Sequence, residues 1–87
     1  MNRHITKGSK MIRQARLSLG YSQQQVATMV AMQIRQYQRL EYGESDIKRI
    51  SIRAGLALCA VLHLDPIDLA FGDNPGLLDD LRNRTAT

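Results

Sequence analysis

The chain has 87 residues, 44% of them hydrophobic, and a net charge of +4, which supports one small domain with little room for a second function. Its single cysteine, Cys59, excludes a disulfide framework and a cysteine-ligated metal site within one chain. No apolar stretch reaches the roughly 20 residues needed to cross a bilayer, and the first residues lack the apolar core of a secretion signal. We therefore expect a cytoplasmic protein without metal or cofactor.

Positive charge is concentrated in the first half of the chain. Seven lysine and arginine residues precede the first acidic residue, Glu41, whereas five aspartates follow Ala54 together with only two arginines. One end of the chain therefore suits a polyanion and the other does not. This asymmetry predicts one nucleic-acid-binding face.

The chain begins with a polar, basic stretch, residues 1–8, that lacks helical periodicity and that we interpret as a flexible arm. Ser9 is a suitable cap for the first helix, and Gly20 a suitable end. Apolar residues recur between them at spacings of three and four: Ile12, Ala15 and Leu19.

Residues 20–43 predict two short helices joined by a tight turn. Ser22 can cap the first of these helices and Gln33 the second. Apolar residues at helical spacing predict the buried sides of both helices: Val26, Ala27, Val30, Tyr37 and Leu40. The second helix then leaves long polar side chains outside: Gln33, Arg35, Gln36, Gln38 and Arg39.

Two further helices and a tail complete the predicted fold. A hydrophobic helix is expected from about 52 to 62, with one broad apolar face formed by Leu56, Leu58, Cys59 and Leu62. A fifth helix starts at the cap Asp65 and at Pro66 and runs to about Phe71, before Gly72. We predict an all-α, five-helix domain over residues 9–72, followed by a tail, 73–87, that can form a short helix of a turn or two and a dimer contact.

Residues 11–71 resemble the lambda-repressor-like, Cro-type (XRE) helix-turn-helix family. The pattern that carries the resemblance runs from an arginine before a glycine turn to a helix closing in Glu-x-Gly: Arg16, Gly20, Ser22, Gln23, Ala27, Leu40, Glu41 and Gly43. The later segment LALCAVLHLDPIDL resembles the fourth and fifth helices of the family. The resemblance implies binding to double-stranded DNA through the helix after the turn.

The resemblance also implies roles for individual residues. Gln23 matches a glutamine that touches a phosphate and braces the recognition helix, and Arg16 and Glu41 match a structural ion pair. Three residues match base-facing positions, where the arginines can donate to guanine and the isoleucine can only contact a thymine methyl: Ile34, Arg35 and Arg39. We add as DNA-contacting residues Gln33, Gln36, Gln38, Lys48 and Arg49, with Gln36 weighted toward phosphate.

Three features depart from the family pattern. Ala31 stands where the turn usually has glycine, and a left-handed alanine costs roughly 1 kcal/mol relative to glycine. Tyr37 replaces a smaller core residue, so its hydroxyl needs a partner. The link after Gly43 is a few residues longer than the family norm.

We predict a homodimeric transcriptional repressor that reads a palindromic operator with half-sites about 10 to 10.5 base pairs apart. The expected dimer contacts are Leu69, Phe71, Leu77, Leu78 and Leu81, some of which can instead complete the core. Two alternatives remain: an antitoxin-like regulator whose tail binds a toxin, and a protein-interaction module that has lost DNA binding. No catalytic constellation is present in the sequence, so we do not expect an enzyme.

Overall fold

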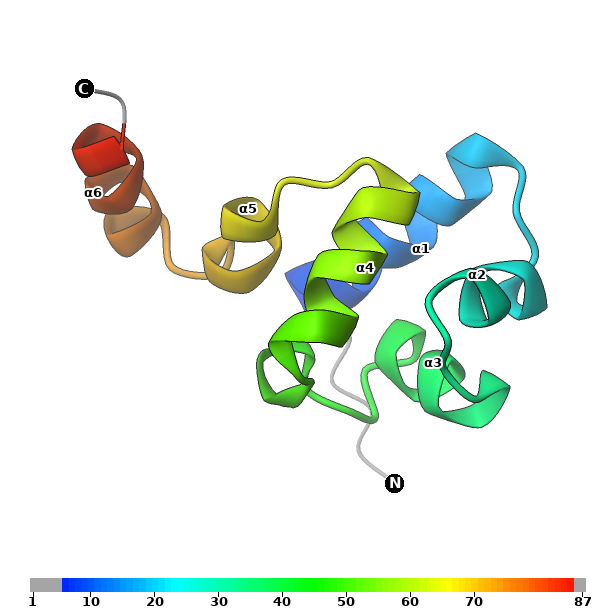
Figure 1. Cartoon of the computed structure of the whole chain (residues 1–87). Coiled ribbons are helices and arrows are strands. Elements are labelled where there is room, and N and C mark those ends of the chain that lie inside the picture. Colours follow the sequence, from blue (N-terminus) through cyan, green and yellow to red (C-terminus); the bar gives the residue numbers. More distant parts are fainter. Residues whose placement is uncertain (1–5, 86–87) are drawn as a thin grey trace.

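The structure is a computed structural model that describes residues 6–85. The described residues form six α-helices and one 3₁₀-helix and contain no strand (Figure 1). In chain order the elements are α1 Lys7–Leu19, α2 Gln23–Met29, α3 Ile34–Glu41, η1 Ile47–Arg49, α4 Ile52–Leu62, α5 Pro66–Phe71 and α6 Pro75–Thr85. The all-α prediction is confirmed. The predicted count of five helices is not confirmed, because the short helix that was possible in the tail is present as α6, with 11 residues.

The start of α1 differs from the prediction. Thr6 caps the helix by accepting from Ser9 N at 3.1 Å, so Ser9 lies inside α1 and is not its cap. Gly8 and Ser9 are buried, and a Cβ atom on Gly8 would lie 3.0 Å from Ile47 Cγ2. This packing extends the helix into the segment predicted as an arm; residues 1–5 of that arm lie outside the described residues.

The core lies where α1, the α2–α3 pair and α4 meet. In Figure 1, α4 crosses in front of α1, with α2 and α3 on one side and α5 on the other. The fully buried side chains come from all four of these helices: Ile12, Val26, Tyr37, Leu40, Leu58 and Leu62. Cys59 is buried as predicted, and burial raises the pKa of its thiol. Leu56 is 52% exposed, so the predicted apolar face of α4 is wrong at this position.

The predicted helix ends agree well with the structure. Gly20 ends α1 in a left-handed conformation with φ 77°, which glycine adopts without steric cost. Asp65 caps α5 by accepting from Ile67 N at 2.8 Å, and Pro66 is the first residue of that helix. α6 packs against α5 and lies at the far end of the molecule from α3 (Figure 1).

Candidate nucleic-acid interface

The turn between α2 and α3 sets where the α3 helix begins. Ser22 caps α2 in a reciprocal capping box with Gln25, as Ser22 Oγ accepts from Gln25 N and Gln25 Oε1 accepts from Ser22 N. Ala31 has φ 56°, so it takes the left-handed conformation, and the predicted cost of roughly 1 kcal/mol relative to glycine applies to it. Gln33 occupies the predicted N-cap position of α3, but its side chain makes no capping hydrogen bond.

The outer face of α3 carries the side chains predicted to read DNA. Arg35, Gln36 and Arg39 are exposed, and Gln33 is exposed just before the helix. Ile34 is half-buried and packs against the core, so only part of its side chain is available to a base. The structure thus brings the two arginines and Gln36 together on one eight-residue helix.

Gln38 was predicted to lie on the exposed face of α3, and the structure places it elsewhere. It is half-buried, and its Nε2 donates to Gln23 Oε1 at 3.1 Å. Gln23 in turn donates through Nε2 to Glu41 Oε1 at 3.2 Å and to the Tyr42 hydroxyl at 3.3 Å. Because an amide has two N–H donors, both donors of Gln23 are used within the protein. The predicted bracing role of Gln23 is therefore present, and its side chain has no donor left for a phosphate in this arrangement.

The expected pair of Arg16 and Glu41 is present in a buried polar cluster. Arg16 Nε donates to Glu41 Oε2 at 2.6 Å and Arg16 Nη2 donates to Glu41 Oε1 at 3.1 Å, which is a bidentate contact. The buried Tyr37 hydroxyl also donates to Glu41 Oε2, so it has the partner that its burial requires. This cluster joins α1 and α2 to the end of α3 and fixes the orientation of α3.

The pKa values in this cluster follow from burial and hydrogen bonding. Burial opposes ionisation of Glu41, but hydrogen bonds from Arg16, Tyr37 and Gln23 outweigh it and lower the pKa of the carboxyl. The hydrogen bond to Glu41 raises the pKa of Arg16, and burial followed by the bond to Glu41 raises the pKa of Tyr37. Glu41 and Arg16 therefore stay charged and Tyr37 stays neutral at physiological pH.

The link between α3 and α4 carries two basic residues, Lys48 and Arg49, and two acidic residues, Glu44 and Asp46. Lys48 and Arg49 lie in η1 and are exposed. Lys48 Nζ donates to Asp73 Oδ2 at 2.7 Å, which raises the pKa of Lys48 and lowers that of Asp73. A phosphate that used Lys48 would therefore compete with Asp73.

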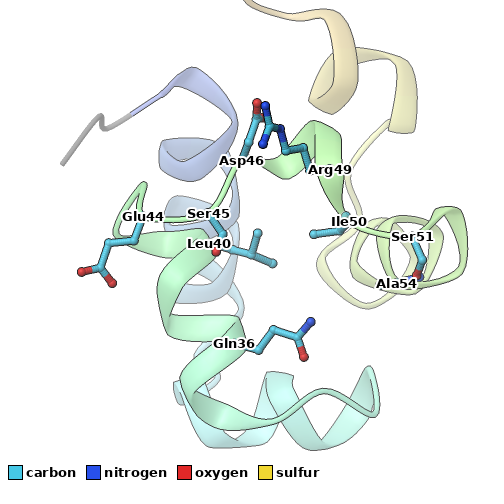
Figure 2. A pocket seen from close by; sticks show the side chains of 9 residues that line it. All are labelled: Gln36, Leu40, Glu44, Ser45, Asp46, Arg49, Ile50, Ser51 and Ala54. Atoms are coloured by element: carbon cyan, nitrogen blue, oxygen red, sulfur yellow. The ribbon is translucent and has the colours of Figure 1, made fainter. Parts of the chain in front are cut away.

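An open hollow of about 700 Å³ separates α3 from this link and from the start of α4. Figure 2 shows the Gln36 side chain extending from α3 toward the hollow and the Arg49 side chain at the opposite end of its rim. A second open hollow beside it is lined by Ala31 and by the exposed Arg53 of α4. Gln36 and Arg49 thus line the first hollow together with the acidic Glu44 and Asp46, and Arg53 lines the second hollow, which shares Ser51 and Ala54 with the first.

Sequence reasoning identified most of this surface but missed two contacts. It did not predict the Gln23–Gln38 bond, since spacing in sequence gives no sign that these two side chains meet. It also assigned no role to Tyr42, whose hydroxyl accepts from Gln23. The position of Tyr42 inside the Glu-x-Gly motif was the feature of the sequence that could have indicated this role.

The predicted dimer residues occupy different environments. Leu69 is only 6% exposed and belongs to the core, which is the alternative role that the prediction allowed for some of these residues. Phe71, Leu78 and Leu81 are half-buried, and Leu77 is 40% exposed.

Within residues 6–85 no cluster of three His, Cys, Asp or Glu could hold a metal ion. No helix in this range has the length and hydrophobicity of a membrane span.

The fold and the exposed α3 face define a helix-turn-helix domain. A family model described as helix-turn-helix matches residues 12–69, from within α1 to within α5. The chain belongs to the lambda-repressor-like, Cro-type (XRE) helix-turn-helix family, a family of DNA-binding transcription regulators. Neither the curated proteins nor the solved structures gave a match to the chain.

Proposed function

We propose that the protein is a sequence-specific regulator of transcription that binds double-stranded DNA as a homodimer and represses a promoter with a palindromic operator. The observation that carries the proposal is the exposed set of Arg35, Gln36 and Arg39 on a helix held by the buried Glu41 cluster. A rigidly mounted helix with arginines at its surface suits the major groove, where arginine donates to guanine O6 and N7.

Phosphate contacts flank this helix in the proposed complex. Gln36 and Arg49 line the hollow beside α3, and Arg53 lines the adjoining one. Their placement suits one backbone strand that passes over both hollows and stays clear of the acidic Glu44 and Asp46 on the first. Such contacts set the register of the protein on DNA without reading sequence. The base readout is therefore assigned to Arg35 and Arg39, with the exposed part of Ile34 against a thymine methyl.

Repression is the simplest output for a chain whose proposed activity is occupancy of a site. Two copies on a two-fold axis would place their α3 helices in neighbouring major grooves about one helical turn apart. The proposed role includes no catalysis and no cofactor and places the protein in the cytoplasm.

Selection from a random duplex pool tests the proposal directly. The full chain is incubated with the pool at several salt concentrations, and the bound DNA is sequenced. Enrichment of a palindrome is expected, with affinity that falls as salt rises because phosphate contacts release counterions. Weak, strongly salt-dependent binding without an enriched motif would contradict sequence-specific regulation.

A charge-matched pair of variants separates readout from general attraction. Arg35→Ala with Arg39→Ala should abolish preference for the enriched motif while circular dichroism stays helical. Arg13→Ala with Arg84→Ala removes the same charge from exposed positions on α1 and α6 and should keep the preference. Equal selectivity in the two double variants would overturn the assigned readout.

A further inference from the structure

An open hollow of about 230 Å³ lies on the outer face of α3, at the two arginines to which base readout is assigned. Its walls are Arg35, Gln38, Arg39, Tyr42 and Glu44. Gln38 follows Arg35 by three residues and Arg39 follows it by four, and residues at these spacings share one face of a helix. The side chain of Gln38 therefore shares this hollow with those of both arginines.

The Glu41 carboxylate fixes the orientation of the Gln23 amide. This carboxylate is buried and paired with Arg16, so its two oxygens can only accept hydrogen bonds. They accept from Arg16 Nε and Nη2, from the Tyr37 hydroxyl and from Gln23 Nε2. Turning the Gln23 amide over would place its carbonyl oxygen against a buried carboxylate and remove one of these bonds. The nitrogen of Gln23 therefore faces Glu41, and its oxygen faces Gln38.

The same restriction passes from Gln23 to Gln38. Gln23 Oε1 can only accept, so Gln38 has to present its nitrogen, and Gln38 Nε2 donates to this oxygen at 3.1 Å. The oxygen and nitrogen of a planar amide point apart, which leaves Gln38 Oε1 on the side away from Gln23. Because Gln38 is half-buried and lines the hollow, this oxygen is the end of the amide offered there. The charge of Glu41 thus sets, through two amides, an acceptor beside two arginine donors.

We infer that Gln38 is a specificity-determining residue whose Oε1, oriented by Gln23, accepts from the exocyclic amino group of a base, N4 of cytosine or N6 of adenine. This inference rests on the proposed function, because it adds a base contact to the arginine readout. In the major groove these amino groups are donors, whereas guanine O6 and N7 and thymine O4 are acceptors. A guanine or thymine oxygen opposite Gln38 Oε1 would bring two acceptors together. The hollow therefore suits an amino group that lies next to a guanine.

The charges of the hollow favour a base edge over a phosphate. Glu44 lines the hollow together with the two arginines. A phosphate carries only acceptors, so both the Glu44 carboxylate and Gln38 Oε1 would oppose it. A base pair presents donors and acceptors side by side, which matches the mixed walls of the hollow. Gln38 is therefore assigned to base readout and not to the DNA backbone.

Selection from the random duplex pool is repeated with Gln38→Ala and with the control Gln14→Ala, which removes an exposed glutamine of α1. The wild type should prefer cytosine or adenine at one position of the motif, and Gln38→Ala should lose the preference at that position alone. Gln14→Ala should keep it. Circular dichroism checks the fold, and Gln38→Met, which keeps the length of the side chain, serves where Gln38→Ala is misfolded.

Base analogues test the amino group directly with the wild-type protein. Cytosine at the identified position is replaced by pyrimidin-2-one, or adenine by purine, since each analogue lacks the exocyclic amino group. The analogue should weaken wild-type binding about threefold to tenfold more than it weakens binding by Gln38→Ala, because one hydrogen bond is lost only in the wild type. Gln38→Ala serves as the reference for the altered base pair. An equal loss in both proteins would overturn the inference.

Gln23→Ala tests the orientation of the Gln38 amide. It removes the partner of Gln38 Nε2, so the amide can turn and present either its oxygen or its nitrogen to a base. This variant should accept thymine or guanine where the wild type accepts cytosine or adenine. A merely structural role would lower affinity alike at every position of the motif. An unchanged preference at the Gln38 position, or a uniform loss, would overturn the inference.

The selection also separates this inference from the proposed function. A wild type that enriches no motif contradicts both. An enriched palindrome with the same base preferences in Gln38→Ala supports the function and overturns the inference. A motif without two-fold symmetry that loses one preference in Gln38→Ala supports the inference and contradicts the palindromic operator.

Discussion

The carboxylate of Glu41 is buried among α1, α2 and α3, whereas the carboxylates that hold Arg82 of α6 against α5 lie at the surface. Arg16 and Glu41 have side chains that are 11% and 0% exposed, whereas Arg82 is 49% exposed beside Asp65 and Asp68. Both regions join helices through arginine and carboxylate groups, but only in the first region are these groups buried from solvent. The comparison indicates that burial and bidentate geometry are concentrated where the orientation of a helix matters for binding.

The two kinds of ion pair differ in whether water can replace a lost partner. Water can solvate either partner of an exposed pair, so such pairs contribute little to stability. A buried partner left alone keeps its full desolvation cost, so breaking a buried pair is strongly destabilising whatever the net worth of the intact pair. The two regions should therefore respond very differently to the same kind of substitution.

Arg16→Met should give the largest effect. It keeps an unbranched apolar stem but leaves the Glu41 carboxylate buried without its bidentate partner, so we expect a loss of about 3–5 kcal/mol in the free energy of unfolding. Urea denaturation followed by circular dichroism measures this value. Arg13→Met, at an exposed position on the same helix, should change it by no more than about 0.5 kcal/mol. Similar losses in both variants would remove the distinction between the two kinds of pair.

Tyr37→Phe should give a smaller loss. It removes the hydroxyl that donates to Glu41 and keeps the buried ring, so we expect about 1.5–3 kcal/mol, the range for a hydrogen bond to a charged group. Thermal and urea unfolding give the comparison with the wild type. Tyr42→Phe, which removes a half-buried hydroxyl that accepts from the neutral Gln23, should cost less. The reverse order would show that Glu41 does not dominate the cluster.

Acid should weaken the buried region through Glu41. Because its pKa is lowered in the folded state, the unfolded chain binds the proton more strongly, and stability falls as pH falls. The contribution is fully present above the ordinary carboxyl pKa of 4.5 and is lost as pH drops through the folded-state value. Unfolding free energies of the wild type and Glu41→Gln, measured from neutral pH downward, should converge at acidic pH. Parallel curves would contradict this assignment.

Arg82→Ala should give the smallest effect. Its contacts with Asp65 and Asp68 are exposed, so we expect a loss of about 0.2–1 kcal/mol that shrinks further in high salt. Urea unfolding at low and high salt measures both parts of this prediction. A salt-independent loss as large as that of Arg16→Met would show that the α5–α6 end is held as firmly as the end of α3.

Local patterns along the chain predicted much of the helical framework. Ser22, Gly20, Asp65 and Pro66 act within a few residues of their own position, so their capping and terminating roles could be read directly. The motif from Arg16 to Glu41 predicted an ion pair between distant helices, because the family pattern carries that information. The start of α1 was misplaced, because the burial of Gly8 against Ile47 depends on a contact across the fold.

The sequence by itself determined the all-α class, most helix ends and the set of arginines and glutamines available to meet DNA. These features depend on side-chain chemistry and on short-range hydrogen bonds. Only the tertiary structure decided that Gln38 is tied to Gln23, that Leu69 is core and that Leu56 is surface. Such outcomes depend on how helices pack side by side, and packing joins residues that no local spacing relates.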